Sequence, residues 1–174
     1  RWLEFRRVLF RSGSAVYGSD AGRAGALRAH VGGRLATSAG NLLPMNTAAL
    51  PNAGGPGANM FVAGDVRANE QTGLIAVHTL MVREHNRLAD QISAANPQMS
   101  DEDVYQRARK LVGAEIQAIT YNEWLPALLG QHGLGSYSGY NPNVDASMNT
   151  AFSTAAFRIG HTMLNDQLVR YNAD

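Results

Sequence analysis

Apolar residues recur every three to four positions between residues 72 and 95. The positions that carry this period are Leu74, Ile75, Val77, Met81, Val82, Leu88 and Ile92. One face of an α-helix repeats at this spacing. Asn96-Pro97 marks the end of the helix, because a proline disfavours helical geometry at the residue before it. The pattern predicts an amphipathic helix over residues 72–95.

A second helix is predicted to begin after Ser100. This serine is followed three residues later by Asp103, the arrangement of an N-terminal capping box, and acidic residues fill the first turn. Apolar positions continue at helical spacing to Trp124, and Pro126 and Gly130 are expected to end the helix.

A third helix is predicted from about Asn149. Its apolar residues surround the helix instead of forming one stripe, which is typical of a helix buried on most sides. These residues are Phe152, Ala155, Ala156, Phe157, Ile159, Met163, Leu164 and Leu168.

The remaining segments predict little regular structure. Residues 13–56 are rich in Gly, Ala, Ser, Asn and Pro and predict at most one short helix, near Asp20 to His30. Residues 131–143 are glycine-rich, contain Pro142 and are predicted to form a loop. No segment has the alternation of a strand, so the expected fold class is mainly α with long irregular N-terminal loops.

The composition narrows the functional classes. With 174 residues, 45% hydrophobic, 17% charged and a formal net charge of +1, the chain has the size of one folded domain and lacks the charge of a nucleic-acid-binding arm. It holds no cysteine, which excludes a disulfide scaffold, a thiolate zinc site and a cysteine nucleophile. No apolar run approaches the roughly 20 residues of a membrane span.

Residues 1–12 differ from the rest of the chain. They hold four arginines and one glutamate, a net charge of +3, without a turn or cap signal. A basic arm for nucleic acid or an acidic surface is one interpretation. We favour another: residues 6–12, Arg-Arg-Val-Leu-Phe-Arg-Ser, resemble the in-frame translation of a sequencing adapter, so that residues 1–12 are a non-native head on residues 13–174.

His161 is a candidate ligand within the third predicted helix. A buried imidazole needs a hydrogen-bond partner, because leaving one unpaired costs about 1–3 kcal/mol. A core histidine bonded to a carbonyl is one interpretation. A metal-binding imidazole is the other, with Gly160 leaving room for a flat macrocycle and Arg158 within reach of its acidic edge.

A second candidate cluster, Gly-Asp-Val-Arg-Ala-Asn-Glu-Gln at residues 64–71, precedes the first predicted helix. Arg67 and Glu70 are three residues apart and form, in one interpretation, a solvent-exposed ion pair. In the other, both face a cavity, where the arginine stabilises developing negative charge and the glutamate is a reactive carboxylate.

Two further histidines, His78 and His85, share a face of the first predicted helix. The H-E-x-x-H order of a helical zinc site is absent, and Arg83 and Arg87 place positive charge beside them. A metal site there is therefore disfavoured. His30 and His132 lie in glycine-rich surroundings and are assigned no role.

Several segments match, in order, the motifs of one family. They are Phe-Val-Ala-Gly-Asp-Val-Arg-Ala-Asn-Glu at 61–70, His-Thr-Leu at 78–80, Arg-Glu-His-Asn-Arg-Leu-Ala at 83–89, the helix over 105–125, and Ala-Phe-Arg-Ile-Gly-His-Thr-Met-Leu at 156–164. From about Val16 to Leu168 the chain resembles the animal-type haem peroxidases of the peroxidase–cyclooxygenase superfamily. The resemblance implies a mostly helical fold around a buried haem.

The resemblance also implies a role for each candidate residue. His161 matches the proximal ligand of the haem iron, and Arg67 matches the distal catalytic arginine, which steadies charge on the departing oxygen of hydrogen peroxide. Glu70 matches the carboxylate that forms an ester with a haem methyl in many members, and Arg158 matches an arginine near a haem propionate.

The chain departs from the family pattern in some positions. Gln71 replaces the methionine that adds a sulfonium link in the myeloperoxidase branch, so that link is excluded. Ser14 matches one ligand of the family's calcium loop, but Ser12 stands where an aspartate is expected. The family's distal histidine and a second ester-forming aspartate belong upstream of the matched segment, and the asparagine that binds the proximal imidazole belongs beyond Asp174.

We therefore expect a partial haem peroxidase domain that uses haem b, ester-linked through Glu70, and hydrogen peroxide to oxidise halides, pseudohalides or phenolic donors. Calcium is expected in the full-length protein, and the family implies secretion. No nucleic acid partner and no membrane span are expected, and the oligomeric state is left open. The alternatives are a fatty-acid dioxygenase of the same superfamily and a haem-free helical interaction module.

Overall fold

Helices account for nearly all the regular structure of the chain. A computed structural model describes residues 13–145 and 147–167, so the head at residues 1–12 lies outside the described residues. Within the described ranges the only β pairing is three isolated bridges, Arg28 with Leu35, Ser38 with Leu42 and Met45 with Phe61. The chain divides into two compact units, one ending at Tyr137 and the other beginning at Ser138. The expected mainly helical fold class is confirmed.

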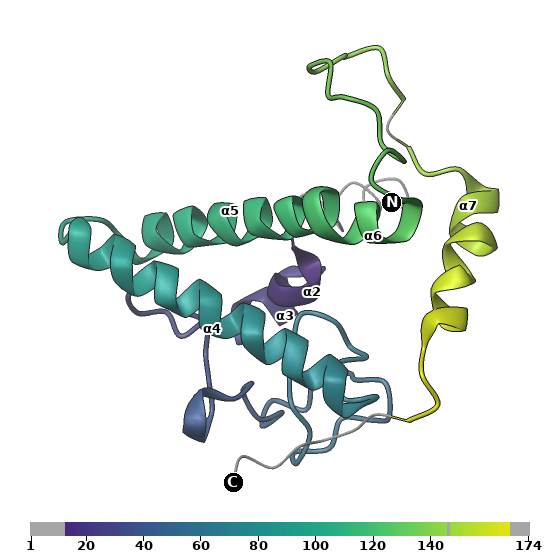
Figure 1. Cartoon of the computed structure of the whole chain (residues 1–174). Coiled ribbons are helices and arrows are strands. Elements are labelled where there is room, and N and C mark those ends of the chain that lie inside the picture. The colour runs from purple at the N-terminus through teal and green to yellow at the C-terminus, as the bar shows by residue number, and fades with distance from the viewer. Residues whose placement is uncertain (1–12, 146, 168–174) are drawn as a thin grey trace, which may run out of the picture. The chain divides into compact units, whose positions relative to one another are not determined.

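The first unit is built on two long helices, α4 (Thr72–Ala95) and α5 (Asp101–Ile119). Figure 1 shows them packed side by side, with the short helix α2 (Ser14–Tyr17) against α4. The predicted bounds of α4 are confirmed, since the apolar period ends where Asn96-Pro97 stops the helix. The buried face includes Val82 and Ala89 of α4 together with Val104, Ala108 and Val112 of α5.

Ser100 caps α5, as predicted. The backbone N–H of Asp103 donates to Ser100 Oγ at 3.1 Å, and the hydroxyl in turn donates to the Asp103 carboxylate at 2.6 Å. Three acidic residues, Asp101, Glu102 and Asp103, lie in the first turn, where they oppose the positive end of the helix dipole. The cap therefore satisfies one of the orphan N–H groups at the start of the helix.

We expect Ser100→Ala to lower the free energy of unfolding by about 1 kcal/mol, because an alanine at the N-cap accepts no hydrogen bond. Urea unfolding followed by circular dichroism measures the change. Ser100→Thr keeps the hydroxyl and is the matched control, for which we expect a much smaller loss. Equal losses in the two variants would show that the hydroxyl does not cap the helix.

The second long helix continues further than predicted. A π-helical turn (Thr120–Trp124) follows α5, and helix α6 (Leu125–Leu129) follows that turn. Pro126 therefore does not end the helix. It lies in the first turn of α6, where a missing N–H costs no hydrogen bond of that helix. Gly130, with φ of 85°, provides the actual end.

The irregular N-terminal segment supplies much of the core. Besides α2, it contains the short helix α3 (Ala21–Ala26), capped by Asp20, and a 3₁₀ turn (Ala39–Asn41), so the prediction of at most one short helix was too low. Tyr17, Leu27 and Leu43 from this segment are at most 2% exposed. Their burial against α4 and α5 explains why so much loop is held in a defined conformation.

A buried cation fixes the loops that follow α3. Arg23 is 4% exposed, and its guanidinium donates to the carbonyl of Ala63 at 2.5 Å, to Asn52 Oδ1 at 3.1 Å and to the carbonyl of Pro51. Burial lowers the pKa of Arg23, and the nearby Asp20 and Asp65 oppose that shift. The guanidinium thus ties α3 to two loop segments, at residues 51–52 and at residue 63.

The second unit corrects the prediction of one buried helix from Asn149. The structure places a short helix, α7 (Thr150–Thr154), and a 3₁₀ helix, η3 (Ala156–Met163), with a break at Ala155, whose φ and ψ are −126° and −70°. Phe157 is 61% exposed and Leu164 is 71% exposed, while Leu168 lies outside the described residues. Within the described part of this unit neither helix has a buried residue, in keeping with the rule that chains below about 40 residues rarely bury a core of their own. The predicted loop over residues 131–143 is confirmed.

No described helix is long and apolar enough to cross a membrane.

Candidate functional site

The turn at residues 64–71 is anchored to the core by the two residues that follow Arg67. Asn69 Oδ1 accepts from the backbone N–H of Phe61 at 2.9 Å, and its Nδ2 donates to the Phe61 carbonyl at 2.8 Å. Ala68 is fully buried. Arg67 and Glu70, in contrast, are exposed. The turn therefore presents these two side chains from a backbone that is tied to the core.

Gly64 lets this turn lie directly on α2. A Cβ at this position would lie 2.2 Å from the backbone oxygen of Ser14 and 2.6 Å from that of Ala15, distances that no side chain tolerates. The backbone N–H of Asp65 donates to the Ala15 carbonyl at 3.2 Å. The close approach fixes the position of residues 64–67 relative to α2.

Arg67 pairs with Asp65 rather than with Glu70. Its Nε donates to Asp65 Oδ1 at 3.0 Å and its Nη2 to Oδ2 at 2.7 Å, while its backbone N–H also donates to Oδ1, at 2.9 Å. The hydrogen bonds from Arg67 lower the pKa of Asp65, and the same pairing raises the pKa of Arg67. The interpretation of Arg67 and Glu70 as a solvent-exposed ion pair is therefore wrong.

The sequence did not indicate the pairing of Arg67 with Asp65. Residues three apart are neighbours on a helix, but residues 64–70 form a turn in which residues two apart meet. Glu70 contacts Arg67 through the backbone, where its N–H donates to the Arg67 carbonyl at 2.9 Å. Its carboxylate makes no hydrogen bond to the residues that the structure describes.

Ser14, the residue matched to a calcium ligand, lies in α2 beside this turn. It is 3% exposed, and its Oγ has no hydrogen-bond partner among the described residues. A buried hydroxyl oxygen without a partner is uncommon, and oxygen atoms are the ligands that Ca²⁺ prefers. Ser14 thus has a free oxygen of the right kind for the role that the sequence suggested.

His161 and Arg158 lie together on η3 in the second unit. Both are exposed, and Arg158 Nε donates to the Thr154 carbonyl at 3.0 Å. The imidazole of His161 makes no hydrogen bond to the described residues, so the interpretation as a core histidine bonded to a carbonyl does not hold there. A Cβ on Gly160 would meet only Met163 Cε, at 3.9 Å. The surface around Gly160 is therefore open to a flat group.

The satisfied core histidine of this chain is His85. Its Nε2 lies 2.8 Å from the Gly33 carbonyl, and its Nδ1 lies 2.9 Å from the hydroxyl of Tyr17. Because a carbonyl only accepts, Nε2 carries the proton and the Tyr17 hydroxyl donates to Nδ1. Burial lowers the pKa of His85 and raises that of Tyr17. The ring of Tyr105 packs against both, at centroid distances of 5.4 and 5.8 Å.

His78 is nearly buried on the same helix. Its Nδ1 donates to the Leu74 carbonyl at 2.8 Å, and its Nε2 is buried without a partner among the described residues. No group of three His, Cys, Asp or Glu side chains arranged for a metal occurs in the described part of the chain.

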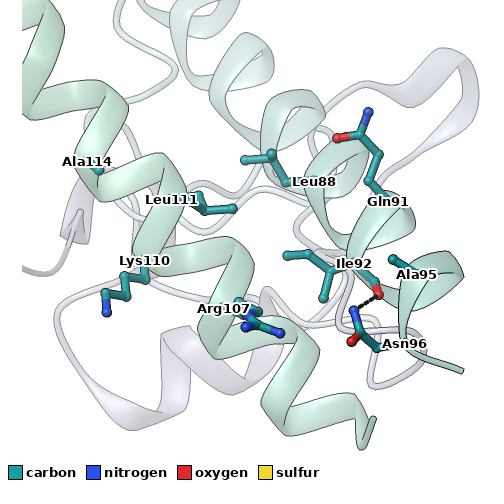
Figure 2. Close-up of a pocket in the computed structure, with 9 residues that line it drawn as sticks. All are labelled: Leu88, Gln91, Ile92, Ala95, Asn96, Arg107, Lys110, Leu111 and Ala114. Atoms are coloured by element: carbon teal, nitrogen blue, oxygen red, sulfur yellow. Dashed lines mark hydrogen bonds between the residues drawn. The ribbon is translucent and has the colours of Figure 1, made fainter. Parts of the chain in front are cut away.

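An open groove of about 470 Å³ lies between the second half of α4 and the middle of α5 (Figure 2). Leu88, Ile92 and Leu111 contribute apolar surface to it, and Arg107 and Lys110 stand among its polar lining residues. None of the site residues predicted from the sequence lines this groove. The candidate residues lie in two parts of the chain, Arg67 and Glu70 on the turn before α4 in the first unit and Arg158 and His161 on η3 in the second.

Known proteins resemble this chain over most of its length. A sequence model of the family described as animal haem peroxidase matches residues 10–174. The chain is 55% identical over 113 residues to the peroxidasin homolog of Mus musculus, covering 63% of this chain and 8% of that protein. It is 42% identical over 187 residues to the thyroid peroxidase of Rattus norvegicus, covering 95% of this chain and 20% of that protein.

Solved structures also resemble this chain. Peroxidase A from Dictyostelium discoideum matches with a TM-score of 0.79 at 34% identity, over 87% of this chain and 31% of that one. A fatty acid alpha-dioxygenase from Arabidopsis thaliana is more distant, with a TM-score of 0.58 at 27% identity over 69% of this chain and 17% of that one. The chain thus spans only a part of each protein that it matches.

Proposed function

This chain belongs to the animal haem peroxidase family, and from that premise we propose that it is part of a haem-dependent peroxidase. The whole enzyme would reduce hydrogen peroxide and oxidise a halide, a pseudohalide or a phenolic donor. The observation that carries the proposal is the turn at residues 64–71, which presents a guanidinium and an uncommitted carboxylate from a backbone anchored to the core.

The available side chains fit a haem. His161 offers an imidazole that makes no hydrogen bond to the described residues, and the bare Gly160 beside it leaves room for a macrocycle. We assign His161 to the iron, Arg158 to a propionate and Glu70 to an ester with a haem methyl. Bound haem supplies the iron-centred redox chemistry.

Arg67 contributes charge to the reaction. Its guanidinium stays protonated because the pairing with Asp65 raises its pKa further. A fixed cation stabilises negative charge that develops on a departing oxygen, and it does so most strongly where the donor is already oriented. We therefore assign Arg67 to the oxygen of hydrogen peroxide that leaves.

Four further proposals remain. The family implies that residues 13–174 form part of the catalytic domain, and the adapter-like sequence of residues 6–12 implies that residues 1–12 are a non-native head. The full-length protein is secreted. It holds a calcium ion for which Ser14 Oγ, buried without a partner, supplies one oxygen ligand.

The test of the axial role uses the full-length, haem-loaded protein that contains this chain. We expect His161→Ala to lose the histidine-dependent Soret band and peroxide-dependent donor oxidation, since the iron has no proximal imidazole. His132→Ala, an exposed histidine of the loop after α6, is the matched control and keeps both. An unchanged spectrum in His161→Ala would overturn the assignment. Absence of haem from the wild-type protein would favour the haem-free interaction module.

A further inference from the structure

We propose that Asp65 is a positioning residue for Arg67: it holds the Nε and Nη2 edge of the guanidinium and thereby turns Nη1 outward, toward a bound oxygen-containing ligand. The inference rests on the proposed function, because it concerns how the arginine of that same site is held. It assigns a role to a residue that neither the sequence motifs nor the comparisons single out.

The hydrogen bonds explain why one orientation is selected. Two of the guanidinium nitrogens, Nε and Nη2, bond to separate oxygens of the same carboxylate, at 3.0 and 2.7 Å. A bidentate pair of this kind is planar and sets the direction of the guanidinium as well as its distance. Nη1 makes no hydrogen bond to the described residues. It is the one nitrogen that the pairing leaves for a ligand.

Asp65 is itself fixed more firmly than its partner. Its side chain is 23% exposed, whereas that of Arg67 is 64% exposed. Its backbone N–H donates to the Ala15 carbonyl, and the preceding Gly64 lies in close contact with the backbone of α2. The carboxylate also accepts from the backbone N–H of Arg67 at 2.9 Å. The anchor is therefore part of the packed structure, and the arginine projects from it.

A second pair in the chain shows what such a contact looks like without these supports. Arg87 bonds in the same bidentate way to Glu84 on α4, at 2.8 and 2.5 Å, and these two side chains are 53% and 26% exposed, close to the values for Arg67 and Asp65. Both side chains extend from one helix surface, and no backbone N–H of Arg87 bonds to the glutamate. Pairs of this exposure contribute little by themselves, because they are screened and cost side-chain entropy. Glu84 thus serves as a control for the loss of an ion pair as such.

Orientation matters for a long, flexible cation. An arginine that is free in solution samples many rotamers, and only a few of them direct an N–H at a ligand. A carboxylate that holds two nitrogens removes most of that freedom before the ligand arrives. The expected consequence is tighter binding of an anionic ligand and faster reaction with peroxide, with the guanidinium charge unchanged.

The experiment uses the full-length, haem-loaded enzyme with Asp65→Asn, Asp65→Glu and Glu84→Gln. Asparagine keeps an oxygen for the backbone N–H of Arg67 but lacks the second anionic oxygen. Two quantities are measured, the second-order rate constant for reaction with hydrogen peroxide and the dissociation constant of fluoride, followed by the haem spectrum at equilibrium. We expect Asp65→Asn to worsen both by about tenfold and Asp65→Glu to recover part of the loss, because its carboxylate re-forms the pair. Glu84→Gln is expected to change neither.

A double-mutant cycle separates positioning from a general effect on structure. In an Arg67→Ala background, Asp65→Asn is expected to cause no further loss in either quantity, since the group that it positions is gone. Additive losses would overturn the proposal, as would an Asp65→Asn variant that behaves like Glu84→Gln. Thermal unfolding midpoints of all variants are compared with that of the wild type. If Asp65→Asn lowers the unfolding midpoint and still lowers the fluoride affinity in the Arg67→Ala background, Asp65 has only a structural role.

The same variants distinguish this inference from the proposed function. If Arg67→Ala alone leaves both the peroxide rate and the fluoride affinity unchanged, the assignment of Arg67 fails and this inference fails with it. If Arg67→Ala lowers both quantities but Asp65→Asn lowers neither, Arg67 keeps its role and only the role of Asp65 is lost.

Discussion

Replacing Gly33 by alanine is expected to lower the free energy of unfolding by about 2–6 kcal/mol, the combined cost of a strained backbone and an overpacked core. Gly33 has φ of +69°, in the left-handed region that disfavours side chains. A Cβ there would lie 2.5 Å from Val104 Cγ1 and 2.6 Å from the backbone nitrogen of Tyr105. The second contact is with helix backbone, which has no rotamer through which to move away.

Gly33 also carries hydrogen bonds that depend on the close approach. Its N–H donates to Asp101 Oδ1 at 2.6 Å, and its carbonyl accepts from His85. A displaced loop therefore disturbs both the first turn of α5 and the buried histidine. Urea unfolding followed by circular dichroism measures the loss.

Gly32→Ala is the matched control for this substitution. Gly32 has φ of +62°, but the nearest atoms to its Cβ position are in the flexible side chain of Arg34, at 4.0 Å. We expect Gly32→Ala to lower the free energy of unfolding by about 1–2 kcal/mol, from the backbone conformation alone. A Gly33→Ala variant no less stable than Gly32→Ala would show that the loop moves away from α5 without cost.

His85→Ala is expected to lower the free energy of unfolding by about 3–5 kcal/mol, because it combines lost hydrogen bonds with a cavity. Two buried partners, the Tyr17 hydroxyl and the Gly33 carbonyl, lose the imidazole that joins them. His30→Ala is the control, since His30 is exposed and makes one bond to the Gly25 carbonyl at 3.2 Å. We expect that control to change stability by less than about 0.5 kcal/mol.

The pH dependence of stability provides an independent check on His85. Burial is the main cause of its lowered pKa; Arg28, Arg34 and Arg109 lower it further, and the bond to the Gly33 carbonyl opposes the shift. The unfolded chain therefore takes up a proton at a higher pH than the folded chain. Its contribution to stability is fully present above its ordinary pKa of 6.5 and is lost as the pH falls toward the folded value.

Urea midpoints at about pH 7.5 and about pH 5 measure this effect. The wild type is expected to lose stability over that interval, and His85→Gln, which does not titrate there, is expected to lose less. An equal loss of the urea midpoint in both proteins would show that other groups cause the acid sensitivity, and it would contradict the burial of a neutral imidazole at this position.

Local patterns were sufficient to predict the two long helices, the end of the first and the N-cap of the second. The apolar period placed α4 at Thr72–Ala95, and the serine and aspartate pattern placed the N-cap of α5 at Ser100. Both depend on residues within one or two turns, so sequence order alone carries the information. Of the two residues expected to end the second helix, Gly130 does so, whereas Pro126 lies in the first turn of α6 beyond a π-helical segment.

The candidate site was predicted only in part. Motif order identified Arg67, Glu70, Arg158 and His161 as candidates, and the family match supports the class of enzyme while their individual roles stay proposals. Asp65 was missed, because its pairing depends on the turn conformation and on the contact of Gly64 with α2. The third predicted helix was wrong in extent and burial, since an apolar pattern does not say whether a second layer is present to cover it.

By itself the sequence determined the two long helices and the family to which the chain belongs, because both depend on short runs of residues. Only the tertiary structure decided which polar groups are buried and with what they pair. His85 meets Tyr17 across 68 positions and Gly33 across 52, and the buried Arg23 meets Ala63 across 40. No local period reports such partners, because burial and hydrogen bonding are set by segments that fold together from distant parts of the chain.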